Sequence, residues 1–176
     1  MCAFLDSLGY ESIGVDPSKR LLEHASHTWG GPLVCASLPD LPFNEESVDQ
    51  IFLINLLRVL HLSDLVDVAL PVAKLIRPGG RLIILDNIKK NDRRFVGHDW
   101  IVDNYSKEGL ILDSYTPIRF GRRITTYLLR YGLIPSCWVE AVAERELRVA
   151  KSVDIQKERF SYMNVVYVFR KRDSVD

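Results

Sequence analysis

The sequence predicts an α/β fold with a mostly parallel sheet, and three observations lead to this prediction. Short apolar runs that suit buried strands alternate with segments whose apolar residues recur at helical spacing. The run VDQIFLINLL is continuously apolar after its first residues, as expected for a parallel strand covered on both faces. Pro78, Gly79 and Gly80 then end a helix and turn the chain into another apolar strand. This order of strands and helices indicates an α/β sheet.

The first half of the chain supplies these elements in order. Residues 2–10 predict a helix that ends at Gly9, and residues 12–16 follow as a short strand. Ser18 is a typical N-cap for a helix over residues 19–27. The later apolar segments predict strands over 32–36, 48–57 and 81–87, and a helix over 63–76.

The second half of the chain has a less regular apolar pattern, and its last segments are expected to complete the sheet. Residues 89–100 are polar and predict a loop, and residues 109–120 predict a small irregular or hairpin element. A helix is expected over 122–132, closed by Gly132. Two closing strands, antiparallel to each other, are expected over 133–143 and 164–172, while residues 144–162 fit either a helix or an extended segment. We expect a single domain over 1–176, because neither repeats nor a low-complexity linker interrupt it.

Composition excludes several classes of protein. The chain has 176 residues, of which 23 are basic and 23 acidic, so no global field attracts nucleic acid or an acidic membrane. No apolar run is long enough to span a bilayer, and the N-terminus lacks the layout of a signal peptide. Three widely spaced cysteines fit neither a disulfide framework nor a zinc knuckle. We therefore expect a cytoplasmic protein.

Asp16 is the first candidate functional residue, because it stands at the end of a predicted strand and just before a helix. Ligands of doubly wound sheets bind beyond the carboxyl ends of the strands. A carboxylate suits a ribose there, since a diol offers two donors and a carboxylate offers two acceptors. A capping or turn residue is the other interpretation of an acid in this position.

Several motifs in sequence order add to this observation. GVDPSKRLLEHA, ASLPDLPFNEESVDQIFLINLLRVLH and LIRPGGRLIILD together resemble the class I S-adenosylmethionine-dependent methyltransferases. The resemblance covers residues 3–88 well and 120–171 loosely. It implies a Rossmann-like sheet that is mostly parallel with an antiparallel C-terminal strand pair, S-adenosylmethionine as cofactor, and a small-molecule methyl acceptor.

The same resemblance implies a role for particular residues. Asp16, followed by Pro17, would hold the ribose hydroxyls of the cofactor. Ser37 and Leu38 would flank the adenine, with Asp40 as a rival for the contact to its exocyclic amine. The residues expected to face the methionine part and the methyl group are Asn55 and Leu56.

One motif of the family is missing from this sequence. A strand and a glycine-rich turn should precede the first helix, but Met1 stands just after that place and Gly9 and Gly14 follow the helix. We therefore expect an N-terminally incomplete domain whose first, central strand is absent. Truncation, a degenerate relative and a strand supplied by another subunit are the three explanations. The absence also favours an alternative function, a catalytically inactive interaction or scaffold subunit, whereas the motifs argue against a dehydrogenase.

Methyl transfer itself needs alignment and exclusion of water, and a general base only for some acceptors. The weak candidates for a base are His61, His98 and Tyr115, and Asp99 and Tyr105 lie in the same region. Spacing alone favours a surface or packing role for each of them. The sequence predicts no metal site, does not favour a nucleic-acid partner, and leaves a homo-oligomer open.

Overall fold

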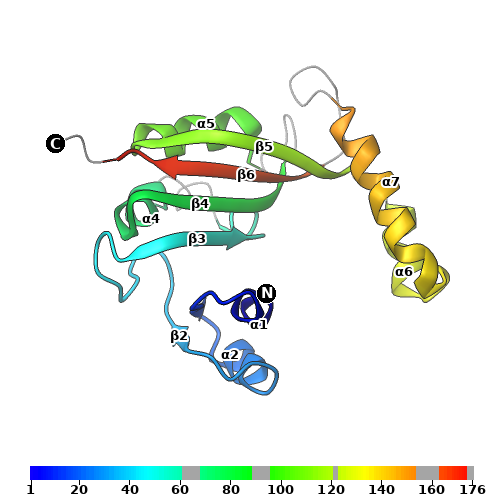
Figure 1. The fold of residues 1–176 in the computed structure, drawn as a ribbon, viewed down its shortest axis with the longest axis horizontal. Helices are drawn as coiled ribbons and strands as arrows, with labels where there is room; N and C mark the ends of the chain where they lie inside the picture. Colours follow the sequence, from blue (N-terminus) through cyan, green and yellow to red (C-terminus); the bar gives the residue numbers. More distant parts are fainter. Residues whose placement is uncertain (61–67, 89–95, 121–122, 154–162, 174–176) are drawn as a thin grey trace. The chain divides into compact units, whose positions relative to one another are not determined.

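The computed structural model describes residues 1–60, 68–88, 96–120, 123–153 and 163–173 (Figure 1). The chain divides into two compact units, Met1–Asn44 and Glu45–Asp176. The single domain expected over 1–176 stays a prediction. Within the described ranges, no helix is long and apolar enough to cross a membrane.

The first unit contains two short helices and a two-stranded parallel sheet. Helix α1 (Cys2–Ser7) ends where Gly9 adopts a φ of +87°, and the amide of Tyr10 donates to the carbonyl of Leu5 at 3.2 Å. This is the glycine-dependent helix end that the sequence predicts. The predicted strands and N-cap are also present, as β1 (Gly14–Asp16), α2 (Lys19–Ser26, capped by Ser18) and β2 (Leu33–Cys35).

The second unit is a four-stranded mixed sheet in the order β3-β4-β6-β5 (Figure 1). Strand β3 runs parallel to β4, whereas β6 is antiparallel to both of its neighbours, β4 and β5. The strands and the two helices packed on the sheet are β3 (Val48–Ile54), α4 (Ala69–Leu75), β4 (Ile76–Ile88), α5 (His98–Lys107), β5 (Leu110–Phe120) and β6 (Met163–Lys171).

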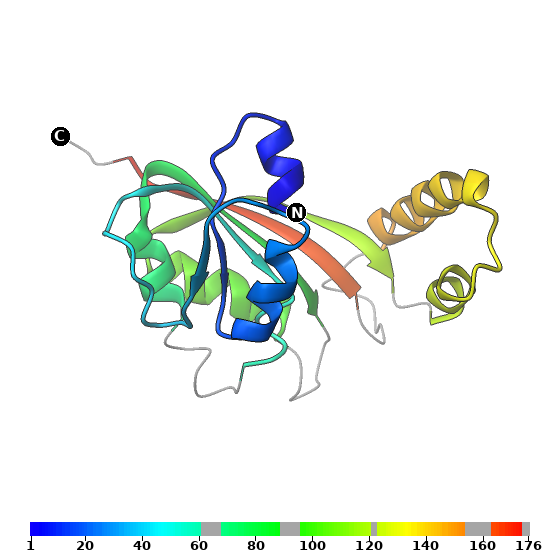
Figure 2. The same cartoon turned by 90° about the horizontal axis from the view of Figure 1, so that it is seen from below.

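The hydrophobic core lies between this sheet and helices α4 and α5, which cover one of its faces (Figure 2). Alternate residues of β4 and β6 point into it, among them Leu82, Ile84, Val165 and Phe169, all of which are fully buried. Each such side chain contributes about 1.5–3 kcal/mol by leaving water. Because successive residues of a strand point to opposite faces, the burial of these side chains determines which residues of β4 and β6 lie on the face of the sheet away from the helices.

The Pro78-Gly79-Gly80 segment forms a bulge at the start of β4. Val48 pairs with Ile76 and Gln50 pairs with Arg81, so four residues of β4 stand opposite one residue of β3. Gly79 has a φ of +73°, and a Cβ on Gly80 would lie 2.8 Å from the carbonyl oxygen of Asp49. Glycine is therefore required at Gly79 by conformation and at Gly80 by space.

The structure corrects three expectations for the second half. Residues 133–143 do not form a strand: they contain a 3-10 turn (Ser136–Trp138) and enter helix α7 (Val139–Lys151). Good helix formers dominate α7, and Val142, Glu146 and Ala150 recur on one helical face, which outweighs the short apolar run at its start. Residues 109–120 are the regular strand β5, and the end of the predicted loop, from His98, is already helix α5.

Other expectations for this half are confirmed. The C-terminal strand pair is antiparallel, although the partner of β6 in it is β5 rather than residues 133–143. Helix α6 (Arg123–Arg130) ends before Gly132, which has a φ of +65°. Among the described strands, β1 pairs with β2 alone and β3 pairs with β4 alone, and the incomplete domain expected from the sequence stays a prediction.

The bulge leads to a stability prediction. Gly80→Ala should lower the free energy of unfolding by about 1–3 kcal/mol, because the added Cβ would lie 2.8 Å from the carbonyl oxygen of Asp49 and 2.9 Å from that of Arg77. Urea denaturation followed by circular dichroism measures this effect. The matched control is Gly97→Ala, where a Cβ has nothing within 4 Å, and equal stabilities of the two variants would contradict the steric argument.

Candidate functional site

The carboxyl edge of the first unit carries Asp16, Pro17 and the start of α2. Asp16 Oδ1 accepts a hydrogen bond from the amide of Ser18 at 2.8 Å, and Ser18 Oγ accepts from the amide of Leu21 at 3.3 Å. The interpretation of Asp16 as a turn residue is therefore confirmed, because one carboxylate oxygen holds the turn, whereas its role toward a ribose stays a prediction. The other oxygen, Oδ2, accepts no hydrogen bond from any described residue and can still accept one from a ligand.

Ser37 and Leu38 lie at the same edge of the same sheet. Because β1 and β2 are parallel and Asp16 is in register with Cys35, the chain leaves β2 beside the carboxyl end of β1. Ser37 is exposed, Leu38 is half-buried and joined to Pro39 by a cis peptide bond, and Asp40 is exposed. The first unit thus brings together the predicted ribose and adenine residues, while their roles stay predictions.

Asn55 and Leu56 lie at the carboxyl edge of the second unit, directly after β3. The amide of Asn55 donates to the carbonyl of Leu85 at 2.8 Å, and Asn55 has a φ of +52°. This left-handed conformation is uncommon outside glycine, although asparagine tolerates it better than most residues. The side chains of Asn55 and Leu56 are both half-buried.

Sequence reasoning missed Asp86, the buried acid that holds this turn. Its Oδ2 accepts from the amide of Leu57 and its Oδ1 from the amide of Asn87, both at 2.7 Å. Burial raises the pKa of the Asp86 carboxyl above its ordinary value, and bonds from the backbone of Asn87, Leu57 and Arg58 oppose that shift. An acid inside the apolar run LIILD was the available signal, since a charge buried on a strand needs dedicated partners.

Two of the predicted candidates for a base, His98 and Tyr115, lie together. Their rings are 4.8 Å apart in an edge-on arrangement, and His98 Nδ1 is 3.0 Å from the hydroxyl of Tyr167, the register partner of Tyr115. Burial lowers the pKa of His98 and raises that of the Tyr167 phenol. His98 is thus neutral near pH 7, and its Nε2 has a free lone pair whenever Nδ1 donates to Tyr167.

The remaining candidates are not part of this cluster. Tyr105 is fully buried and packs against Phe169, with 5.6 Å between ring centroids, and Asp99 is exposed. His61 lies outside the described residues. In the described parts of the chain, no group of three or more His, Cys, Asp or Glu residues could hold a metal ion.

Asn55, Asn87 and Asn164 form a row that two side-chain hydrogen bonds hold together. Asn164 Nδ2 donates to Asn87 Oδ1 at 2.7 Å, and Asn87 Nδ2 donates to Asn55 Oδ1 at 3.2 Å. Asn87 and Asn164 are register partners on β4 and β6. The row lies on the sheet face opposite Asp86, because neighbouring residues of a strand point to opposite faces.

Comparison with known proteins assigns the fold. The methyltransferase-domain family matches residues 1–84. The [4+2]-cyclase SpnF has a TM-score of 0.63 and 14% identity, over 92% of this chain and 66% of that one. Geranyl diphosphate methyltransferase in complex with S-adenosylmethionine has a TM-score of 0.63 and 13% identity, over 93% of this chain and 69% of that one.

A third structure belongs to the same group. Geranyl diphosphate C-methyltransferase from Streptomyces coelicolor A3(2), in complex with Mg²⁺, geranyl diphosphate and S-adenosylhomocysteine, has a TM-score of 0.63 and 11% identity, over 93% of this chain and 65% of that one. The chain thus spans about two thirds of the length of these three proteins. No curated protein matches the sequence.

These findings confirm the resemblance to the class I S-adenosylmethionine-dependent methyltransferases: the fold of the chain is theirs, and residues 1–84 match their methyltransferase domain. S-adenosylmethionine, the predicted cofactor, is the cofactor of that family. Among these neighbours the fold serves a cyclase as well as methyltransferases, so the fold alone does not fix the reaction.

Asp86 gives a prediction for the turn after β3. Asp86→Asn should lower the free energy of unfolding by about 1–3 kcal/mol, because a carboxamide has one accepting oxygen for two backbone N–H groups. Chemical denaturation at pH 7 measures the change. Asp113→Asn, which removes one carboxylate that is 3.6 Å from Arg170 in a partly exposed pair, is the control and should change stability by less than about 1 kcal/mol. An Asp86→Asn variant with the same free energy of unfolding as wild type would contradict this role of Asp86.

His98 gives a prediction about pH. Because the folded state lowers the pKa of His98 below its ordinary 6.5, the unfolded chain binds more protons between the two values. The contribution of His98 to the free energy of unfolding should therefore rise with pH through that window and level off above pH 6.5. His98→Asn should flatten the rise in urea titrations from pH 5 to 8, whereas His24→Asn, on the exposed surface of α2, should retain it. Identical profiles for wild type and His98→Asn would refute the assignment.

Proposed function

We propose that the protein binds S-adenosylmethionine and transfers its methyl group to a small-molecule acceptor. The observation that carries the proposal is the methyltransferase-domain match over residues 1–84, which contain every predicted cofactor residue. The residues fit such a ligand: Asp16 Oδ2 is an acceptor suited to a ribose hydroxyl, and Asn55 Nδ2 is a donor suited to a carboxylate. The proposed contacts are Asp16 and Pro17 for the ribose, Ser37 and Leu38 for the adenine, and Asn55 and Leu56 for the methionine part.

The bound cofactor would supply an already activated methyl group, so the protein has to orient the acceptor and exclude water. On the acceptor side, His98 would receive the proton of an acceptor O–H or N–H at Nε2 while Nδ1 donates to Tyr167. Tyr115 would form a wall beside His98 through its ring contact. A small acceptor is supported by the balanced charge of the chain and by two structural neighbours that are geranyl diphosphate methyltransferases.

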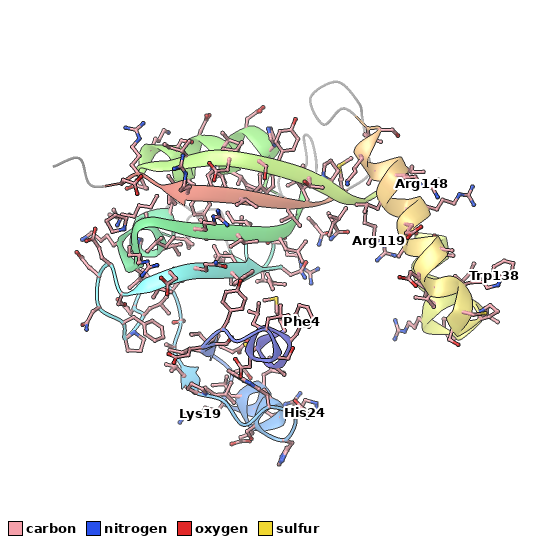
Figure 3. The ribbon with its side chains drawn as sticks, viewed as in Figure 1. Phe4, Lys19, His24, Arg119, Trp138 and Arg148 are labelled. Carbon is pink, nitrogen blue, oxygen red and sulfur yellow. The ribbon has the colours of Figure 1, made fainter. Side chains whose placement is uncertain are left out.

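The alternative is an interaction subunit without catalysis, and one observation favours it. Exposed apolar side chains occur on α6, on the segment that follows it, on the 3-10 turn and at the start of α7, namely Tyr127, Tyr131, Leu133, Trp138 and Val139. Figure 3 shows Trp138 projecting outward from these helices. Exposed apolar surface of this kind marks interaction sites. A homo-oligomer through this surface belongs to the same alternative.

Calorimetry with S-adenosylhomocysteine separates the two functions. Wild type should bind saturably, and Asp16→Asn should bind about tenfold to a hundredfold more weakly, because the amide keeps the bond to Ser18 but replaces Oδ2 by a group that cannot accept. Asp103→Ala, on the exposed side of α5, is the control and should bind as wild type does. Absence of binding by the wild type at millimolar ligand would reject the methyltransferase and favour the interaction subunit.

A further inference from the structure

The row of asparagines has a direction, and this direction decides what Asn55 offers to a ligand. Each carboxamide has one accepting oxygen and one donating nitrogen. Asn87 accepts from Asn164 and donates to Asn55, so both ends of its amide are engaged. The oxygen of Asn55 is therefore occupied, and Asn55 Nδ2 is the terminal donor, with no acceptor among the described residues.

The backbone holds this donor at the carboxyl edge of β3. The amide of Asn55 is tied to Leu85 on β4, and the φ of +52° turns the residue out of the strand conformation. A strained backbone conformation that the surroundings maintain is typical of ligand sites. Asn87 and Asn164 have no such strain and stand on the two strands, β4 and β6, that anchor the core of this unit.

We propose that Asn87 and Asn164 are positioning residues that orient the Asn55 carboxamide so that its nitrogen donates to the carboxylate of the cofactor's methionine part. This inference rests on the proposed function. It goes beyond it in assigning a role to two residues that no sequence motif marks. The chemistry is specific, because a reversed Asn55 amide would present an oxygen to an anion and repel it.

The direction of the row can be reversed without changing its shape. Aspartate can only accept, so Asn164→Asp forces Asn87 to donate toward β6, and Asn87 then accepts from Asn55 Nδ2. The oxygen of Asn55 becomes the terminal group. Asn87→Asp has the same consequence while keeping the bond from Asn164, so two variants reach the same reversed state by different routes.

The test is calorimetry on the full chain with two probes. S-adenosylhomocysteine has the carboxylate, and 5′-methylthioadenosine has the adenine and ribose but lacks the amino-acid part. Asn164→Asp and Asn87→Asp should each bind S-adenosylhomocysteine about tenfold or more weakly than wild type, with 5′-methylthioadenosine binding changed by less than about twofold. Weaker binding of both probes would indicate general damage and overturn the inference.

Two further variants separate orientation from added charge. Ser114→Asp places the same charge on an exposed position of β5 and should leave both affinities unchanged. In an Asn55→Ala background, Asn164→Asp should have no further effect on S-adenosylhomocysteine, since there is no amide left to reverse. An effect that persists in this background would show direct repulsion and overturn the inference.

The two proposals fail in different ways. If wild type binds neither probe, the proposed function fails and the inference fails with it. If wild type binds both probes and the aspartate variants keep full affinity for S-adenosylhomocysteine, the function stands and the positioning role is rejected.

Discussion

The pairing of β4 with β6 is the constraint on which the rest of the second unit depends. Eight consecutive residues of β4, Arg81 to Ile88, have register partners on β6. The buried side chains determine which face of the sheet alternate residues of both strands occupy. The residues between them must then lie on the opposite face. Asp86 and Asn87 follow each other in sequence yet serve opposite faces: one holds the turn after β3, and the other joins the asparagine row.

Much of this architecture could be predicted from local sequence. The apolar runs of β3 and β4, the N-cap Ser18 and the glycines after α1 and α6 each have a local physical cause, and each is present in the structure. Residues 133–143 were mispredicted because a short apolar run does not distinguish a strand from the start of a helix. The helix formers that decide the matter lie further along, in Glu144–Lys151.

The candidate site was predictable only where a motif marks it. Asp16 stands out because an acid follows an apolar strand, and the structure gives it a turn bond while leaving one oxygen available. Asn164 is 77 residues from Asn87, and no local pattern indicates that their side chains meet. His98 and Tyr115 were weak candidates for the same reason, since only the packing of α5 on β5 brings an imidazole beside a phenol. Contacts between distant strands follow from register, which tertiary packing determines.

The glycine bulge at the start of β4 also protects the alignment of the sheet against slippage. If β4 slid by one position, each of its side chains would move to the other face of the sheet. Asp86 would then leave the core face, and the Asn87 amide would take its place among apolar side chains. The bulge places four residues of β4 opposite Asp49, and its conformation needs glycine at Gly79 and Gly80. If β4 slid along β3, other residues would have to adopt the bulge conformation, and they are not glycines. The bulge that ends at Gly80 therefore prevents β4 from sliding along β3 and keeps Asp86 on its face of the sheet.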